Sequence, residues 1–246
     1  MISKAEIKQV KLLHQKKYRE EKQLFVAEGP KVVKELLQSK YNAKEIFATD
    51  EFQVSIPNIQ VRKVNEKELK TISTLTTPNQ VLAVFEIPSP LVLQPSSLSA
   101  QLLLALDDIR DPGNLGTIIR IADWFGIKNL LCSESCVDLF NPKVVQASMG
   151  SIARVNVYYE NLESTLLKTK SFLPVYGATM DGENIYSQGL SSCGIILIGN
   201  ESKGVSKNLL TLVSQKISIP KFSHGADSLN AAVATAVICS EFRRRS

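Results

Sequence analysis

Metal-binding patterns are scarce in this chain of 246 residues. It has four cysteines, none of them paired as Cys-x-x-Cys, and only two histidines. Structural zinc sites need several closely spaced thiolate or imidazole ligands, so we expect no metal site. Cys132, Cys193 and Cys239 lie within apolar runs, a pattern typical of small buried side chains in a reducing compartment.

Targeting and membrane signals are also lacking. The first residues, Met1 to Lys4, do not resemble the apolar stretch of a signal peptide. No apolar run reaches the about 18 residues that a transmembrane helix requires. We therefore expect a cytoplasmic protein without a membrane span.

Two nucleotide-binding fingerprints are missing as well. Gly-x-Gly-x-x-Gly occurs nowhere in the chain, which argues against a dinucleotide cofactor such as NAD. Gly199 and Gly204 have the spacing of a phosphate-binding loop, but Val205 stands where that loop needs its lysine. The sequence therefore disfavours hydrolysis of ATP or GTP.

Positive charge, in contrast, is concentrated near the N-terminus. The first 40 residues contain ten basic and five acidic side chains, an excess that equals the net charge of +5 for the whole chain. Such a segment can contact nucleic-acid phosphates, although a solvated helix face explains the same pattern. The candidate RNA contacts are Lys8, Lys11, Lys16, Lys17, Arg19 and Lys22.

Composition divides the chain into two blocks. Residues 1–88 combine a basic helical pattern with short apolar runs at 24–27, 45–48 and 81–85, which predicts a small α/β domain. Residues 89–100 contain prolines and serines and are predicted to form a linker. Residues 101–246 form the second predicted domain.

Short apolar runs recur through the second block, with helical patterns between most of them. These runs cover residues 102–106, 129–132, 155–159, 175–178, 195–198 and 217–219. They are continuous rather than alternating, which indicates strands that are buried on both faces. The pattern predicts an α/β domain with a mostly parallel sheet.

Ligands of open α/β sheets bind beyond the carboxyl ends of the strands, so we considered the residues after each predicted strand. Residues 107–120 include a Pro112-Gly113 turn and a helix that starts near Asn114 and contains Arg120. Because its neighbours are apolar, Arg120 either pairs with a carboxylate such as Asp107 or Asp123 or serves a functional role.

Two further segments follow predicted strands. Residues 199–206 connect a buried strand to a helix. Residues 220–230 lead into an alanine-rich helix that Asp227 or Ser228 is expected to cap. Neither segment identifies a function by itself, because each also reads as ordinary turn and helix-start chemistry.

The order of the three segments is specific. Asn114-Leu115-Gly116 with Arg120, then Gly199-Asn200-Glu201 with Gly204, then Ile219-Pro220 with Ser228-Leu229-Asn230, resembles the three motifs of the SpoU/TrmH branch of SPOUT RNA methyltransferases. Residues 101–245 carry this resemblance. A looser resemblance, in residues 16–19 and 25–29, links the first block to that family's ribosomal-protein-like substrate-binding domain.

The resemblance implies a deep trefoil knot in the parallel-sheet domain, a homodimer with sites at its interface, and S-adenosylmethionine as cofactor. By position, the catalytic and substrate-positioning residues are Asn114, Arg120, Glu201, Ser228 and Asn230. The cofactor-binding residues are Thr179, Gly199, Ile219 and Leu229. Lys221 departs from the family, because many relatives have methionine there, and the loop at 222–227 is a residue longer than in many of them.

The implied function is transfer of a methyl group to a ribose 2′-hydroxyl, with ribosomal RNA favoured over transfer RNA as substrate. Arginine rarely loses its proton, so we expect Arg120 to hold a phosphate and stabilise the developing alkoxide. Two alternatives remain: a catalytically silent RNA-binding protein, which would not bind S-adenosylmethionine, and a nucleotide-dependent enzyme of ordinary topology.

Overall fold

The computed structural model describes residues 2–54, 59, 61–223, 225 and 227–244. Contacts divide the chain into two compact units. The N-terminal unit contains Met1–Ser89 and Asp138–Ala153, and the C-terminal unit contains Pro90–Val137 and Arg154–Ser246. The division from sequence does not anticipate that residues 138–153 join the first unit.

A mixed four-stranded sheet forms the centre of the N-terminal unit, in the order β1-β4-β2-β3. The strands are β1 (Leu24–Glu28), β2 (Ala43–Ala48), β3 (Val61–Lys63) and β4 (Val81–Glu86), and only β2 and β3 are parallel. The helices are α1 (Lys4–Leu12), α2 (Lys16–Lys22), α3 (Pro30–Leu37), α4 (Glu66–Ile72) and, from the later segment, α6 (Pro142–Ala147). The expected small α/β domain is confirmed.

Local sequence explains where several of these helices begin. Ser3 and Glu6 form a capping box at α1, and Asn65 and Glu68 form another at α4. Gly29 directly precedes Pro30, the first residue of α3, and has a backbone φ of +85°. Residues with a side chain rarely adopt this conformation, whereas glycine does so freely, and proline suits the first position of a helix. Each of these three helices thus starts at a residue that satisfies the free amides of the first turn or suits its geometry.

The later segment is packed into the N-terminal unit by aromatic side chains. The Phe140 ring lies 4.7 Å from that of Phe25 and 6.3 Å from that of Tyr41, measured between centroids. Phe25 also stacks on Phe85 at 5.5 Å. Because Phe25 and Phe85 are fully buried, residues 138–153 contribute to the core of this unit.

Six parallel strands form the sheet of the C-terminal unit, in the order β10-β8-β9-β5-β6-β7. They are β5 (Leu102–Leu106), β6 (Asn129–Ser133), β7 (Asn156–Glu160), β8 (Val175–Asn184), β9 (Gly194–Ile198) and β10 (Gln215–Ser218). All residues of β5 and β9 are buried, as the continuous apolar runs predict. The expectation of a parallel α/β sheet is confirmed.

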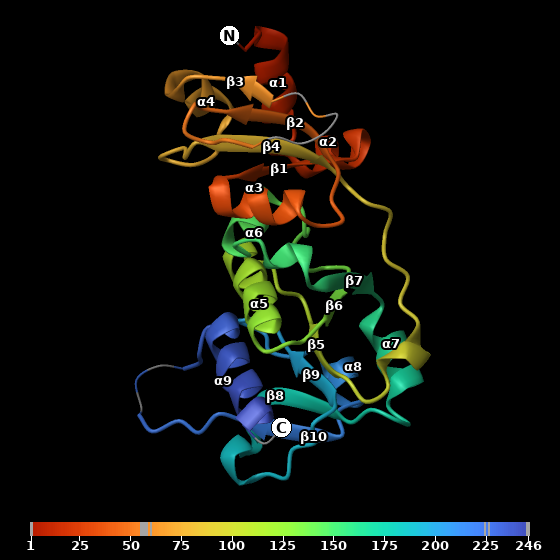
Figure 1. Ribbon diagram of the computed structural model, residues 1–246. Helices are drawn as coiled ribbons and strands as arrows, with labels where there is room; N and C mark the ends of the chain where they lie inside the picture. The colour runs from red at the N-terminus through yellow and green to blue at the C-terminus, as the bar shows by residue number, and fades with distance from the viewer. Residues whose placement is uncertain (1, 55–58, 60, 224, 226, 245–246) are drawn as a thin grey trace. The chain divides into compact units, whose positions relative to one another are not determined.

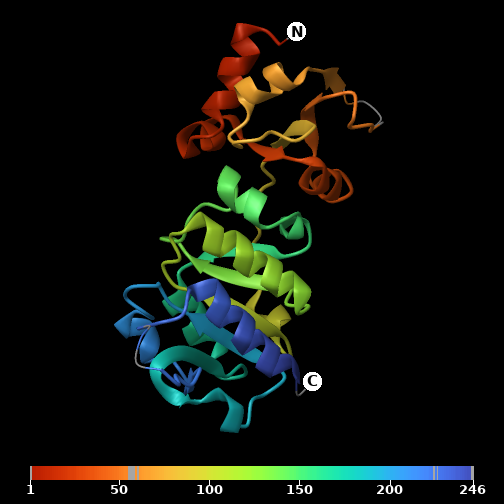
Figure 2. The ribbon, with the colours of Figure 1, turned by 90° about the vertical axis from the view of Figure 1, so that its left-hand side faces the viewer.

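Helices cover both faces of this sheet (Figure 1). Helices α5 (Pro112–Trp124) and α9 (Ala231–Arg244) pack against each other on one face, as Figure 2 shows. Helices α7 (Leu162–Thr169) and α8 (Lys207–Leu210) share an apolar core with the other face. Short 3-10 helices occur at Pro95–Leu98, Ser151–Ala153 and Ile185–Ser187.

Some local expectations need correction. Asn141 caps α6 by accepting a hydrogen bond from the Lys143 amide. Helix α9, however, is capped by Asn230, whose Oδ1 accepts from the amides of Ala232 and Val233 at 2.9 and 3.3 Å. Asp227 and Ser228 lie before that first turn and do not cap it.

The described residues contain neither a helix that could span a membrane nor a cluster of metal ligands. Within them, no helix is both long enough and apolar enough to cross a membrane. The described part of the chain also contains no group of three or more histidine, cysteine, aspartate or glutamate side chains that could hold a metal ion.

Candidate active site

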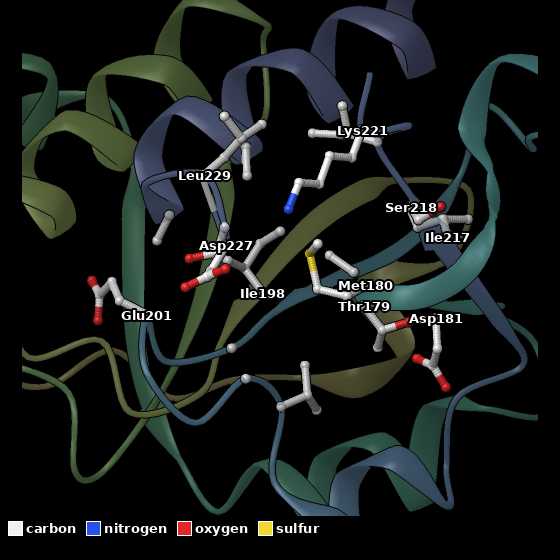
Figure 3. A pocket seen from close by; sticks show the side chains of 18 of the residues that line it. Thr179, Met180, Asp181, Ile198, Glu201, Ile217, Ser218, Lys221, Asp227 and Leu229 are labelled. Atoms are coloured by element: carbon white, nitrogen blue, oxygen red, sulfur yellow. The ribbon is translucent and has the colours of Figure 1, made fainter. Parts of the chain in front are cut away.

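A pocket of about 700 Å³ opens beside the middle of β8 and the carboxyl ends of β9 and β10 (Figure 3). Its walls are residues 178–181 of β8, the loop that follows β9, the segment after β10 and the first half of α9. These segments lie far apart in the sequence, and the parallel sheet brings them to one edge. The predicted cofactor residues Thr179, Gly199, Ile219 and Leu229 all line this pocket.

The loop after β9 folds tightly on itself. The Asn200 and Gly204 backbones exchange hydrogen bonds of 3.1 and 2.9 Å. A Cβ atom on Gly199 would lie 2.2 Å from the carbonyl carbon of Gly204, a distance that real structures do not tolerate. Glycine at 199 is therefore needed by the loop itself, and its backbone is left facing the pocket.

Asn200 also holds this loop in place, a role that the sequence did not reveal. Its Oδ1 accepts hydrogen bonds from the amides of Ser202 and Lys203, and its Nδ2 donates to the Asp108 carbonyl at 2.8 Å. The loop after β9 is thereby joined to the loop after β5. The only signal in the sequence is an asparagine after a strand, which is common in turns.

Helix α5 begins beside these loops. The Asp111 carboxylate accepts a hydrogen bond of 2.8 Å from the Asn114 amide and so caps the helix. Asp107, at the end of β5, is buried and accepts from the Ser206 amide at 2.8 Å. Asp111 thus fixes the backbone at Asn114, and Asp107 ties the end of β5 to the segment before α8.

Asn114, Glu201 and Asn230 form a chain of side-chain hydrogen bonds. Asn114 Nδ2 donates to Glu201 Oε1 at 2.6 Å, and Asn230 Nδ2 donates to Asn114 Oδ1 at 2.8 Å. Because the Asn230 oxygen accepts from the first turn of α9, the orientation of both amides is fixed. The structure thus brings together three predicted catalytic residues from three separate motifs.

The charge at Asp108 is set by its neighbours in the loop after β5. Burial raises the pKa of this carboxyl, but hydrogen bonds from Arg110 and Ser135 outweigh it and hold the pKa below its usual value. Arg110 Nε donates to Asp108 Oδ1 at 2.7 Å. Asp108 therefore stays ionised at neutral pH beside the Asn200 contact.

Comparisons with known proteins decide the family. Residues 101–240 match the SpoU rRNA Methylase family, and residues 4–83 match the MRM3-like substrate binding domain. This chain belongs to the SpoU rRNA methylase family. The predicted membership is confirmed by a match that includes all three motifs.

Curated relatives match this chain over nearly its full length. The chain is 31% identical to the 23S rRNA (guanosine(2553)-2′-O)-methyltransferase RlmP of Bacillus subtilis, over 96% of this chain and 95% of that protein. It is 27% identical to the mitochondrial rRNA methyltransferase 3 of Mus musculus, over 93% and 69% of the two chains.

Solved structures agree with the fold over the full length. A TrmH-family protein from Porphyromonas gingivalis aligns with a TM-score of 0.89 and 38% identity, covering 100% of both chains. An AdoMet-bound rRNA methyltransferase from Sinorhizobium meliloti aligns with a TM-score of 0.85 and 30% identity, covering 100% of this chain and 97% of that one.

The two remaining predicted catalytic residues, Ser228 and Arg120, do not belong to this hydrogen-bond chain. Ser228 is exposed and lines the pocket. Arg120 is exposed on α5 and forms no hydrogen bond or ion pair with another described residue. It is absent from the pocket lining, as are Asn114 and Asn230, which lie beside the pocket through their bonds to Glu201 and to each other. The structural pairing with Asp107 or Asp123 is thus not observed; Arg154 donates to Asp123 instead, at 2.8 Å.

The predicted RNA contacts divide into two groups. The five lysines at 8, 11, 16, 17 and 22 are exposed on α1 and α2 or beside them. Arg19 is only 2% exposed, is ion-paired with Asp138, and donates to the Leu13 carbonyl at 3.0 Å. Because its guanidinium lies in the interior, Arg19 is removed from the RNA-contacting set.

Proposed function

We propose that this SpoU-family chain transfers a methyl group to a ribose 2′-hydroxyl of ribosomal RNA, at the edge of the pocket beside Asn114. The observation that carries the proposal is the hydrogen-bond chain from Asn230 through Asn114 to Glu201, which joins three motifs next to one pocket. The activity is that of an S-adenosylmethionine-dependent RNA 2′-O-methyltransferase, as in the relatives.

The pocket fits S-adenosylmethionine. The Thr179 Oγ1 atom is buried and has no partner at full hydrogen-bond geometry among the described residues, although it lies near enough to the Asp181 carboxylate to help lower the pKa of that group. A ligand in the pocket would complete its hydrogen bonding. Gly199, Ile219 and Leu229 line the same space, and their backbone groups would hold the adenosine part. When bound, this cofactor supplies a methyl group activated by a positively charged sulfur.

Asn114 would orient the ribose. Its Nδ2 donates one hydrogen to Glu201, which leaves the second N–H available for the 2′-oxygen. Since Glu201 and Asn230 hold the two ends of this amide, the donor would be fixed in direction before substrate arrives. Such positioning lowers the barrier without any proton transfer by the amide itself.

Arg120 would act in the pocket of a partner copy. Within one chain it lies six residues beyond Asn114, which is about 9 Å along the helix axis, and outside the pocket lining. It shares its helix face with Trp124, four residues on, whose side chain is 84% exposed. We propose a homodimer formed through this face, in which Arg120 binds the phosphate beside the reacting ribose and Ser228 helps to place the sugar.

A mixing experiment tests this arrangement. Asn114→Ala and Arg120→Ala chains would each be inactive alone while still binding S-adenosylmethionine. A mixed dimer should regain transfer, because one of its two pockets combines an intact Asn114 with an intact Arg120 from the other copy. If mixing restored nothing although the mixed dimer formed, Arg120 would act within its own chain.

The C-terminal segment would form the knot expected of this family. Strand β10 lies at the sheet edge next to β8, whereas α9 packs on α5. The chain from Ile219 to Asn230 must therefore cross the carboxyl ends of β8 and β9, where the pocket lies. Threading of this segment through the loop at 199–206 is the proposed basis of the trefoil knot.

The N-terminal unit would recruit RNA through its exposed lysines and correspond to the ribosomal-protein-like domain of residues 1–88. Lysine–phosphate contacts provide salt-dependent affinity with little sequence information. Bacterial RlmP supports a cytoplasmic site of action, while other relatives are mitochondrial.

The direct test is transfer of labelled methyl from S-adenosylmethionine to unmodified ribosomal and transfer RNA. We expect label in ribosomal RNA at one linkage that resists alkali, and none with Asn114→Ala. Label found only in transfer RNA would show that transfer RNA, and not ribosomal RNA, is the substrate. A wild-type chain that binds no S-adenosylmethionine would refute the enzymatic function.

A further inference from the structure

Two opposite charges face the pocket from the segment between β10 and α9. Lys221 and Asp227 both line it. Figure 3 shows the Lys221 side chain extending toward the middle of the pocket, with the Asp227 carboxylate on the adjoining side. Within the described chain, neither side chain forms an ion pair or a hydrogen bond.

The other charged side chains of the lining are already engaged. Glu201 accepts the hydrogen bond from Asn114. Asp181 pairs with Lys216 at 2.7 Å, and Lys203 interacts electrostatically with Asp108. Among the described residues of the lining, Lys221 and Asp227 are therefore the charges that remain free to bind a ligand.

Much of the remaining lining is apolar. It includes Ala178, Ile198, Leu210, Ile217, Ile219 and Ile238. Such surface suits a flat purine base, whereas an ammonium and a carboxylate near each other suit a ligand group that carries both charges. The α-amino acid end of S-adenosylmethionine has an ammonium and a carboxylate on one carbon atom.

We propose that Lys221 and Asp227 bind the amino acid end of S-adenosylmethionine, an inference that rests on the proposed function. The Lys221 ammonium donates to the α-carboxylate, and the Asp227 carboxylate accepts from the α-ammonium. A lysine next to the sulfonium would repel it, so the carboxylate is the favourable partner for Lys221. The pair therefore sets which way the cofactor lies in the pocket.

Calorimetric binding of three ligands tests each half of the pair. S-adenosylhomocysteine carries both charged groups, its decarboxylated analogue keeps only the amine, and 5′-methylthioadenosine has neither. Lys221→Met should weaken S-adenosylhomocysteine about tenfold, the effect of losing one charge-assisted hydrogen bond, and leave the other two ligands unchanged. Asp227→Asn should weaken the first two ligands and spare the third.

Two control variants accompany the measurement. Lys221→Arg keeps the charge and should retain most of the affinity. Lys207→Met removes an exposed lysine of α8 that does not line the pocket and should change nothing. Wild-type affinity for 5′-methylthioadenosine in every variant would show that the pocket is still folded.

The possible outcomes separate this inference from the proposed function. Equal weakening of all three ligands by Lys221→Met would mean that the side chain shapes the pocket and does not read the carboxylate. Unchanged cofactor affinity with weaker RNA binding would assign Lys221 to a phosphate instead. Either result overturns the inference and leaves the methyltransferase intact, whereas a wild-type chain that binds none of the cofactor forms overturns both.

Discussion

Asn230 serves two partners at once. Its Oδ1 accepts from the first turn of α9, and its Nδ2 donates to Asn114. The sequence left open whether this residue is a helix cap or a member of the site, and the structure shows both contacts. One side chain therefore couples the start of a helix to the orientation of Asn114.

Substitution of Asn230 separates these two roles. Asn230→Asp keeps an oxygen to cap α9 but loses the N–H that Asn114 accepts. We expect near wild-type stability and about 100-fold slower methyl transfer. The loss in rate follows because Asn114 would no longer be held in its orientation, and small errors in the position of such a group have effects of that size. Single-turnover kinetics and thermal unfolding measure the two quantities.

Asn230→Ala is the matched variant. It loses the cap as well, which costs about 1 kcal/mol of unfolding free energy. If Asn230→Asp transferred methyl groups at the wild-type rate, the bond to Asn114 would be irrelevant to catalysis.

Arg19 shows why charge alone misleads. It lies in a basic run of the sequence, and its partner Asp138 is 119 residues away. No local pattern reports such a contact, so the prediction grouped Arg19 with the solvent-exposed lysines. Its burial makes it part of the structure instead.

Arg19→Met and Lys8→Met should therefore have opposite effects. Arg19→Met leaves Asp138 without its ion-pair partner and should cost about 3 kcal/mol of unfolding free energy, as for other buried pairs. Lys8→Met should cost under about 0.5 kcal/mol but lower the slope of RNA affinity against salt by about one phosphate contact. Urea unfolding and RNA titrations at several salt concentrations measure these effects; a stable Arg19→Met chain with weaker RNA binding would restore Arg19 to the RNA surface.

At the scale of elements, the loop after β9 depends on close backbone packing. A methyl group on Gly199 has no room beside Gly204. Gly199→Ala should therefore lower the unfolding free energy by about 2–3 kcal/mol, in the range of overpacked sites, and weaken S-adenosylmethionine binding because the loop must shift.

Gly189→Ala is the control for this substitution. Nothing lies within 4 Å of a Cβ at that exposed position, so the change should stay within about 0.5 kcal/mol. Thermal unfolding compares the two variants, and equal stability would show that the loop accommodates a side chain at 199.

Most elements of the parallel sheet could be predicted, because buried strands carry continuous apolar runs such as Leu102–Leu106. Strand β3 and helix α4 could not, since three residues of strand and a charged, short helix leave little periodicity. The basic segment at 4–22 forms two helices rather than one continuous pattern. The cofactor-binding residues could be predicted only from the order of the three motifs. Which segments form the walls of the pocket follows from the order of the strands in the sheet, and short-range sequence patterns do not encode that order.

At the scale of the whole molecule, the packed helices α5 and α9 each expose an apolar side chain. Trp124 is 84% exposed on α5, and Val233 is 50% exposed on α9. A single exposed apolar side chain is ordinary on a protein surface, whereas a contiguous group of them marks a surface that another protein covers. We propose dimerisation through the face of α5 that carries Trp124 and Arg120.

Trp124→Glu should convert the proposed dimer to a monomer. A charge at the centre of an apolar interface is left desolvated and unpaired, which opposes association. Light scattering after size-exclusion chromatography gives the mass, and transfer activity should fall with it. Leu167→Glu, at an exposed apolar residue of α7, should leave the mass unchanged; a Trp124→Glu dimer would place the interface elsewhere.

The division of the chain has a practical consequence for any attempt to exchange its modules. Phe140 lies within the SpoU match, yet its ring packs on Phe25 and Tyr41 of the first block. A graft that replaces residues 1–88 would strip this aromatic contact from a segment left behind in the recipient. The N-terminal unit therefore includes a segment from within the SpoU match, and a working chimera must carry residues 138–153 along with residues 1–88.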